Sequence, residues 1–159
     1  MNQSHELAIS LRKSYLAFHR QANALMSEFG ITADQFVILN VVANEPGLTQ
    51  IELVERTASD PNTMAAIVRR LELRGLVVRR SHARDGRARC VSLTAAGRKL
   101  QERAYDGLES LRKALWECTE GASQKEIEDF LLHVHETFSA PFAGINGRPA
   151  RPLSKDASE

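Results

Sequence analysis

Residues 60–93 constrain the fold of this chain more than any other segment does, beginning with a well-delimited helix. Asp60 is a favourable N-cap, and Pro61 suits the first helical turn because its missing N–H would be unpaired there anyway. Gly75 supplies a left-handed C-cap. These signals predict a helix over 61–74, whose two faces differ in character.

One face of this helix is apolar and the other is polar and cationic. The apolar side chains recur at helical spacing, at Met64, Ile67, Val68 and Leu71. The opposite side carries Asn62, Thr63, Ala66, Arg69 and Arg70. Residues 76–82 and 90–93 then have strand patterns around an Asp85-Gly86 turn signal. A cationic helix beside an arginine-rich hairpin is typical of a winged-helix DNA-binding module.

Positive charge is concentrated in residues 69–89, called here the basic segment. It contains eight arginines, no lysine and two acids, so its net charge is +6 while the rest of the chain sums to −5. Arginine pairs with phosphate through a planar fork, whereas lysine acts as a point charge. The segment therefore has the electrostatic pattern of a polyanion-binding surface, although a merely solvated patch is the alternative.

Composition excludes several other classes of protein. The 159 residues are 43% hydrophobic, enough for a core, and only 6% aromatic, so there is little material for base-stacking platforms. The longest apolar run, residues 36–43, is interrupted by Asn40 and is too short to span a bilayer. No signal peptide is visible, so we expect a cytoplasmic protein. With no acid pair, activated nucleophile, metal cluster or phosphate loop, we expect no enzyme, cofactor or metal.

Helical patterns precede the hairpin. A stripe at spacings of three and four predicts a long first helix ending at Gly30, and its members are Leu7, Leu11, Tyr15, Phe18, Ala22, Leu25 and Phe29. Thr32 with Gln35, and Thr49 with Glu52, form capping boxes that open a buried second helix and a short third helix. The third helix and the helix over 61–74, with a tight turn between them, match a helix-turn-helix.

Further helices follow the hairpin. Thr94 can cap a long helix that ends near Gly121, with Gly107 weakening it by up to roughly 1 kcal/mol relative to Ala. Ser123 with Glu126 forms a third capping box before a last amphipathic helix. The Gly/Pro/Ser-rich residues 143–159 are expected to form a flexible tail.

The predicted architecture is mainly α with a small β-hairpin. A winged helix-turn-helix domain occupies residues 32–94, and residues 1–31 and 95–142 form a helical dimerisation region. Long amphipathic helices at both ends have apolar stripes to bury, which favours a symmetric homodimer. The alternative is that these helices pack on each other within one subunit.

At this level of detail the sequence resembles the MarR family of bacterial transcriptional regulators, from about residue 18 to residue 100. The resemblance is most specific in four segments: Leu48-Thr49-Gln50 with Leu53, the RRLELRGLVVR sequence, Arg84-Asp85-Gly86-Arg87, and Val91-Ser92-Leu93-Thr94-Ala95-Ala96-Gly97. It implies a dimeric winged helix-turn-helix protein on pseudo-palindromic double-stranded DNA. It also implies frequent repression, relieved by a small aromatic or phenolic compound.

The resemblance also assigns DNA-binding roles. Arg87 corresponds to a wing-tip arginine that enters the minor groove, and Asp85 to the acid that orients it. The full predicted set is Gln50, Ser59, Asn62, Thr63, Ala66, Arg69, Arg70, Arg84, Asp85 and Arg87. Ala65 and Ala66 stand where many relatives have larger polar residues, and alanine makes no base hydrogen bond. Shape readout by the wing is therefore expected to carry a larger share of specificity.

The resemblance also implies an effector pocket, because ligands of this family sit between the dimerisation helices and the DNA-binding domain. Its candidate residues are Tyr15, His19, Arg20, Phe36 and Asn40, an aromatic wall with groups able to hold a phenolate or carboxylate. Taken one at a time, Tyr15 and Phe36 are better explained as core residues, and His19 as an ordinary partly buried histidine. Two alternative functions stay open: a winged-helix protein-interaction module, and a redox-sensing regulator that uses Cys90 or Cys118.

Overall fold

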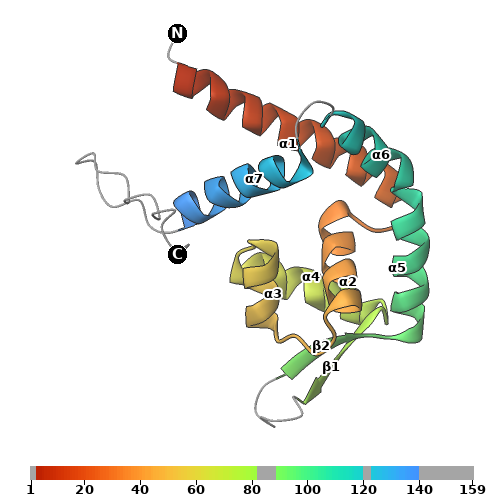
Figure 1. The fold of residues 1–159 in the computed structure, drawn as a ribbon. Helices are drawn as coiled ribbons and strands as arrows, with labels where there is room; N and C mark the ends of the chain where they lie inside the picture. The colour runs from red at the N-terminus through yellow and green to blue at the C-terminus, as the bar shows by residue number, and fades with distance from the viewer. Residues whose placement is uncertain (1–2, 82–88, 120–122, 140–159) are drawn as a thin grey trace, which may run out of the picture. The chain divides into compact units, whose positions relative to one another are not determined.

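The computed structural model describes residues 3–81, 89–119 and 123–139, which form seven helices and one antiparallel hairpin (Figure 1). The elements are α1 (Gln3–Ser27), α2 (Ala33–Asn44), α3 (Gln50–Thr57), α4 (Pro61–Leu73), β1 (Val77–Ser81), β2 (Arg89–Leu93), α5 (Ala95–Gly107), α6 (Glu109–Glu117) and α7 (Gln124–Ser139). The chain divides into two compact units, Met1–Lys113 and Ala114–Glu159. No helix in the described residues is long and apolar enough to cross a membrane.

Local capping fixes where the helices of the first unit begin. Thr32 and Gln35 form a reciprocal capping box at α2, and Thr49 with Glu52 forms another at α3. The Asp60 side chain accepts a hydrogen bond from the Thr63 backbone N–H at 2.9 Å, with Pro61 in the first turn of α4. Each cap satisfies backbone donors that would otherwise be unpaired, which confirms these predicted helix starts.

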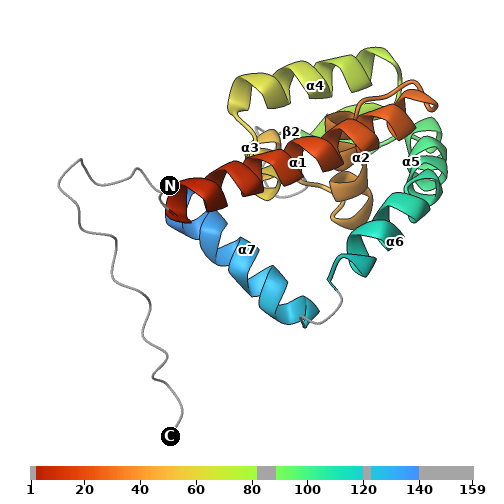
Figure 2. The same cartoon turned by 90° about the horizontal axis from the view of Figure 1, so that it is seen from above.

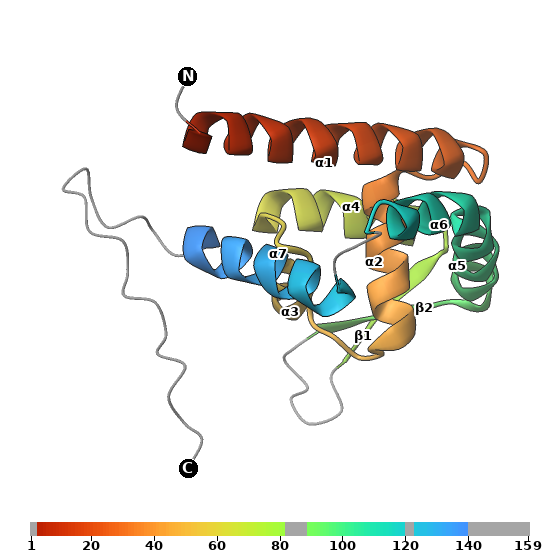
Figure 3. The same ribbon diagram turned by 45° about the horizontal axis from the view of Figure 1, so that its top comes forward.

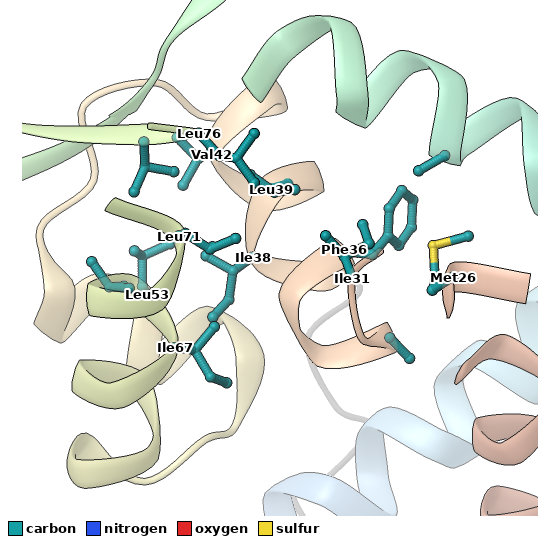
Figure 4. Packing of buried hydrophobic residues seen from close by; sticks show 14 of the residues in the cluster. Met26, Ile31, Phe36, Ile38, Leu39, Val42, Leu53, Ile67, Leu71 and Leu76 are labelled. Atoms are coloured by element: carbon teal, nitrogen blue, oxygen red, sulfur yellow. The ribbon is translucent and has the colours of Figure 1, made fainter. Parts of the chain in front are cut away.

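The core of the first unit is built around α2. Helix α2 packs against α5, α3, α4 and β2, and α1 lies across it (Figure 3). Leu53, Ile67 and Leu71 converge on Ile38 in one part of the core, while Met26, Ile31 and Phe36 fill the neighbouring part (Figure 4). The expectation that α2 is buried centrally is therefore confirmed. The C-terminal end of α1 also contacts α5 (Figure 2).

The hairpin is closed at its base by α5. Val77 pairs with Leu93 and Arg80 with Cys90, and Thr49 adds an isolated bridge to Cys90. The Thr94 hydroxyl donates to the Gly75 carbonyl at 2.6 Å, while the Thr94 N–H donates to the Leu76 carbonyl at 3.1 Å. The predicted strands are confirmed to within one residue, and the predicted Asp85-Gly86 turn lies outside the described residues.

The expectation of one long helix after Thr94 is wrong, because the helix is interrupted at Leu108 between α5 and α6. Gly107 does more than lower helix propensity. A Cβ atom at this position would lie 2.6 Å from the Phe29 ring, so this residue of the α1–α2 turn packs where a side chain would have to be. A tertiary contact therefore requires glycine at the end of α5, next to the break.

The second unit contains the end of α6 and all of α7. Ser123 and Glu126 form the predicted third capping box: the Ser123 N–H donates to the Glu126 carboxylate at 3.0 Å, and the Ser123 hydroxyl accepts from the Glu126 N–H at 3.2 Å. No residue of α7 is buried. Its large apolar side chains remain exposed, namely Phe130, Leu131, Leu132 and Phe138.

Candidate nucleic-acid interface and adjoining cavity

Helix α4 presents a polar and cationic face to solvent. Its opposite face is fully occupied by the core, because Met64, Val68 and Leu71 are 0% exposed. The predicted contact residues are all exposed: Asn62, Thr63, Ala66, Arg69 and Arg70. Because two small residues, half-buried Ala65 and exposed Ala66, interrupt this face, few side chains on it can hydrogen-bond to bases.

The polar side chains at the starts of α3 and α4 differ in whether they are already hydrogen-bonded or half-buried. The Thr49 hydroxyl is engaged with Glu52 at 2.8 Å, which agrees with a capping role. Gln50 and Ser59 are half-buried, at the start of α3 and just before the N-cap of α4. Hydrogen bonding by the side chain and then the backbone of Thr63 holds the pKa of Asp60 below its usual value. A permanent negative charge therefore stands at the start of α4.

The arginines of the basic segment divide into two groups. Arg74 donates to the Gly30 carbonyl at 2.7 Å, and Arg79 lies 3.6 Å from the Glu72 carboxylate. Glu72 is thus paired with Arg79 rather than with Arg69 or Arg70.

The second group remains exposed on the surface. Arg69, Arg70, Arg80 and Arg89 form no hydrogen bond or ion pair with another described residue. The predicted wing residues Arg84, Asp85 and Arg87 lie outside the described residues. These four exposed cations, two on α4 and two on the hairpin, are suited to phosphate contact.

A cavity of about 560 Å³ lies behind the start of α4, within the first unit. Its walls come from α1, α2, the turn between α3 and α4, and the region around the α5–α6 break. The lining is mainly apolar, including Ala22, Met26, Ile38, Ile67, Leu108 and Leu111. Thr57, Ala58, Ser59 and Thr63 place the helix-turn-helix turn in the same wall. A molecule that filled the cavity would contact the turn that precedes α4.

Four of the five predicted effector residues line this cavity: Tyr15, His19, Phe36 and Asn40. Tyr15 and His19 stack with their ring centroids 5.5 Å apart. The Asn40 side-chain oxygen accepts a hydrogen bond from buried Gln101 at 3.1 Å, which fixes its orientation. Arg20 is exposed and does not line the cavity.

The cavity contains a cation that sequence reasoning missed. Arg112 lines it, with its guanidinium carbon 3.8 Å from the centroid of the Tyr105 ring, and also donates to the Tyr105 carbonyl and the Glu109 carboxylate. Tyr105 and Arg112 are seven residues apart, about two helical turns, and this spacing could have indicated that the two side chains lie on the same face. The helix break at Leu108 obscured it, and neither residue belongs to the apolar stripe.

The remaining candidate chemistry is dispersed. Cys90 is buried and Cys118 is exposed in the other compact unit. His133 and His135 are both exposed on α7. Within residues 3–81, 89–119 and 123–139, no group of three or more histidine, cysteine or acidic residues is placed to hold a metal ion.

Comparison with known proteins gives a consistent result. The sequence model of the MarR family matches residues 29–88. The HTH-type transcriptional repressor Rv2887 of Mycobacterium tuberculosis is 36% identical over 84 residues, which are 53% of this chain and 60% of that protein. The transcriptional regulator HosA of Escherichia coli is 40% identical over 70 residues, 44% of this chain and 52% of that one. The matches thus span little more than half the length of these relatives.

The fold of the chain is also similar to that of solved transcriptional regulators. CouR from Rhodococcus jostii RHA1, solved with p-coumaroyl-CoA, superposes with a TM-score of 0.73 at 20% identity and covers 85% of this chain and 94% of its own. CouR bound to a 23-mer DNA duplex superposes with a TM-score of 0.67 at 25% identity, covering 86% of this chain and 94% of its own. The fold of this chain is therefore the winged-helix fold of those regulators.

Proposed function

We propose that this chain is a MarR-family transcriptional repressor that binds a pseudo-palindromic site on double-stranded DNA as a homodimer, and the match of the family model to residues 29–88 supports this. In this proposal α4 enters the major groove, and the hairpin, with Arg87 in its connecting segment, reads the minor groove. The proposal includes no catalytic step.

The observation that carries this proposal is the division of α4 into a buried and an exposed face. The apolar stripe of α4 is buried in the core, so the exposed face can contact a partner outside the chain. The hairpin that follows α4 carries two more exposed arginines, Arg80 and Arg89, and neither forms an ion pair with an acid within the described residues. Uncompensated arginines beside a polar helix favour a polyanion over a protein surface of mixed charge.

The homodimer is supported by apolar side chains that remain exposed on terminal helices. On α1 these are Leu7, Leu11, Tyr15 and Phe18, and on α7 they are Phe130, Leu131, Leu132 and Phe138. Exposed apolar stripes of this kind mark interaction surfaces. A second copy of the same chain satisfies them with two-fold symmetry, which matches a two-fold DNA site.

The cavity supports regulation by a small aromatic anion. Tyr15, Phe36 and Tyr105 provide flat apolar contact, and Arg112 provides a cation for a carboxylate or phenolate. The same cavity is lined by Ala58, whose φ of 49° is the positive value of a left-handed conformation unusual for alanine. A ligand that displaces this turn would shift the start of α4 and weaken DNA binding.

The first experiment is selection of binding sites from a random pool of duplex DNA by the purified full-length chain. Affinity for the selected duplex is then measured by fluorescence anisotropy between about 50 and 200 mM salt. We expect log K to fall steeply with log salt and Arg87→Ala to weaken binding at least tenfold while leaving the dimer intact. A flat salt response would favour the protein-interaction module instead.

A second experiment tests the cavity with 4-hydroxybenzoate as an aromatic probe and cyclohexanecarboxylate as a non-aromatic control. We expect the aromatic acid to release the selected duplex and Arg112→Met to raise the concentration required. Arg20→Met is the matched control, because Arg20 is an exposed cation outside the cavity. Equal effects of the two substitutions would contradict the assignment of Arg112.

A further inference from the structure

Arg74 differs from the other arginines near α4 in what it binds. It is the C-cap residue of α4, and its Nη1 atom donates to the Gly30 carbonyl at 2.7 Å, across 44 positions of sequence. Its Nη2 atom lies 3.6 Å from the point where a Cβ on Gly30 would stand, so the guanidinium lies directly beside this backbone. No described acid forms an ion pair with it. Its charge is committed to a main-chain carbonyl.

Both ends of this contact are held by their own hydrogen bonds. On the Gly30 side, the Gly30 N–H donates to the Ser27 carbonyl at 2.9 Å and the Ala33 N–H donates to the Asn23 side chain at 2.8 Å. On the other side, the Gly75 N–H donates to the Glu72 carbonyl at 2.9 Å. The hydrogen bond therefore joins two ordered turns, the α1–α2 turn and the end of α4.

The contact is the polar link between these two regions. Helix α4 packs mainly on α3, β1 and α2. Across the described part of the chain, no other hydrogen bond joins α4 or its caps to the α1–α2 turn. The other end of α4 borders the cavity through Thr63. A helix tethered at its C-terminal end and displaced at its N-terminal end responds mainly by tilting about the tether.

From this geometry we propose that Arg74 is a positioning residue that sets the orientation of α4 for DNA by anchoring its C-terminal end to Gly30, rather than a phosphate contact. The proposal rests on the DNA-binding function proposed above. It removes one cation of the basic segment from the surface available to phosphate. It also makes the Gly30 carbonyl, outside the helix-turn-helix, part of what orients the DNA-facing helix.

The test compares Arg74→Met with Arg70→Met, which removes the same charge one turn earlier on α4. Both arginines are exposed, but only Arg74 forms a side-chain hydrogen bond to another described residue. Affinity for the selected duplex is measured over the same salt series. Loss of a phosphate contact reduces the slope of log K against log salt by about 0.9, or roughly 2 for a symmetric dimer. We expect Arg74→Met to weaken binding about tenfold with an unchanged slope. Arg74→Lys, which keeps a donor on a long side chain, should recover most of the loss.

Hydrogen exchange in the free protein gives a readout that is independent of DNA. We expect faster exchange in residues 30–33 and 71–76 of Arg74→Met, and none of this change in Arg70→Met. A reduced salt slope for Arg74→Met would make Arg74 a phosphate contact and overturn the proposal, as would unchanged affinity and exchange. A wild-type chain that binds no duplex would contradict the proposed function, while the exchange comparison would still decide whether the tether orders α4.

Discussion

Helix α4 buries its apolar stripe within its own chain, whereas α7 leaves a comparable stripe exposed. In α4, Met64 and Leu71 are 0% exposed, while in α7 Phe130 is 49% exposed and Phe138 is 67% exposed. Both helices have apolar residues at spacings of three and four, and both begin at a side-chain cap. The local signals that form the two helices are therefore equivalent, and only the partner surface differs.

This difference shows what an amphipathic pattern does and does not specify. It specifies which face of a helix excludes water, because side chains at these spacings share one side. It does not specify whether the covering surface belongs to the same chain. For α4 the covering residues come from neighbouring elements such as α2 and α3. For α7 we propose that they come from a second copy.

The largest expected effect comes from placing charge on the exposed stripe of α7. Replacing Phe130 and Leu131 together by glutamate should convert the dimer to monomers, since four buried charges per dimer would be left unpaired. Analytical ultracentrifugation over a range of protein concentrations measures this change. Lys125→Glu is the control, because it changes the net charge by the same amount at an exposed polar position of the same helix, and it should remain dimeric. A dimer that survives in the Phe130/Leu131 variant would place the interface elsewhere.

The next effect separates intrachain burial from burial between chains. Leu71→Ala should lower the free energy of unfolding by about 2–5 kcal/mol, because a fully buried side chain leaves a cavity. This loss should be the same at every protein concentration. Leu131→Ala, at a 48% exposed position, should destabilise mainly through a shifted concentration dependence. Urea unfolding at two protein concentrations measures both effects. If the two variants depended on protein concentration in the same way, Leu71 and Leu131 would not differ in being buried within or between chains.

The smallest effect concerns the side-chain caps at which α4 and α7 each begin. Ser123 hydrogen bonds, from its side chain and then its backbone, hold the pKa of Glu126 below its usual value, as Thr63 does for Asp60. A carboxylate with a lowered folded-state pKa stabilises the fold above its unfolded-state pKa, near 4, and this contribution is lost as pH falls through the lowered value.

Asp60→Asn and Glu126→Gln keep a polar side chain but cannot titrate. The stability of each variant should therefore decrease less than that of the wild type below about pH 4. Thermal unfolding between pH 2 and pH 7 measures this. Asp34→Asn is the control, because Asp34 is an exposed acid in the first turn of α2 and not its N-cap. An acid profile unchanged by either cap substitution would show that the caps are not linked to stability.

The parts of the fold that the sequence predicted correctly depend on neighbours close in the chain. Capping residues such as Thr32 and Asp60 act within three positions, so the starts of α2 and α4 were predictable. The break between α5 and α6 was not predicted, and neither was the contact beside it, in which Phe29 of the α1–α2 turn packs against Gly107. Periodicity continued through this point without interruption.

The same distinction applies to the candidate site. The exposed face of α4 follows from helical spacing, as does the shared location of Tyr15 and His19 on α1. The division of arginines between surface and tether does not, because the partner of Arg74 is a backbone carbonyl 44 residues away. Arg112 was likewise missed, because its place in the cavity wall comes from tertiary packing and not from the apolar stripe. Charge counts locate a basic segment, but only tertiary contacts show which charges are free.

The base of the hairpin has a consequence for protein engineering. Thr94 fixes Gly75 and Leu76 to the start of α5, and a Cβ on Gly97 would lie 1.9 Å from the Leu76 carbonyl oxygen. The strand pairs from Val77–Leu93 to Ser81–Arg89 therefore extend from a base that is already closed by hydrogen bonds. Lengthening the connection between these strands adds a closure cost that grows only slowly with length. We therefore expect a change in the length of the connection between Ser81 and Arg89 to leave the base of the hairpin and the start of α5 in place.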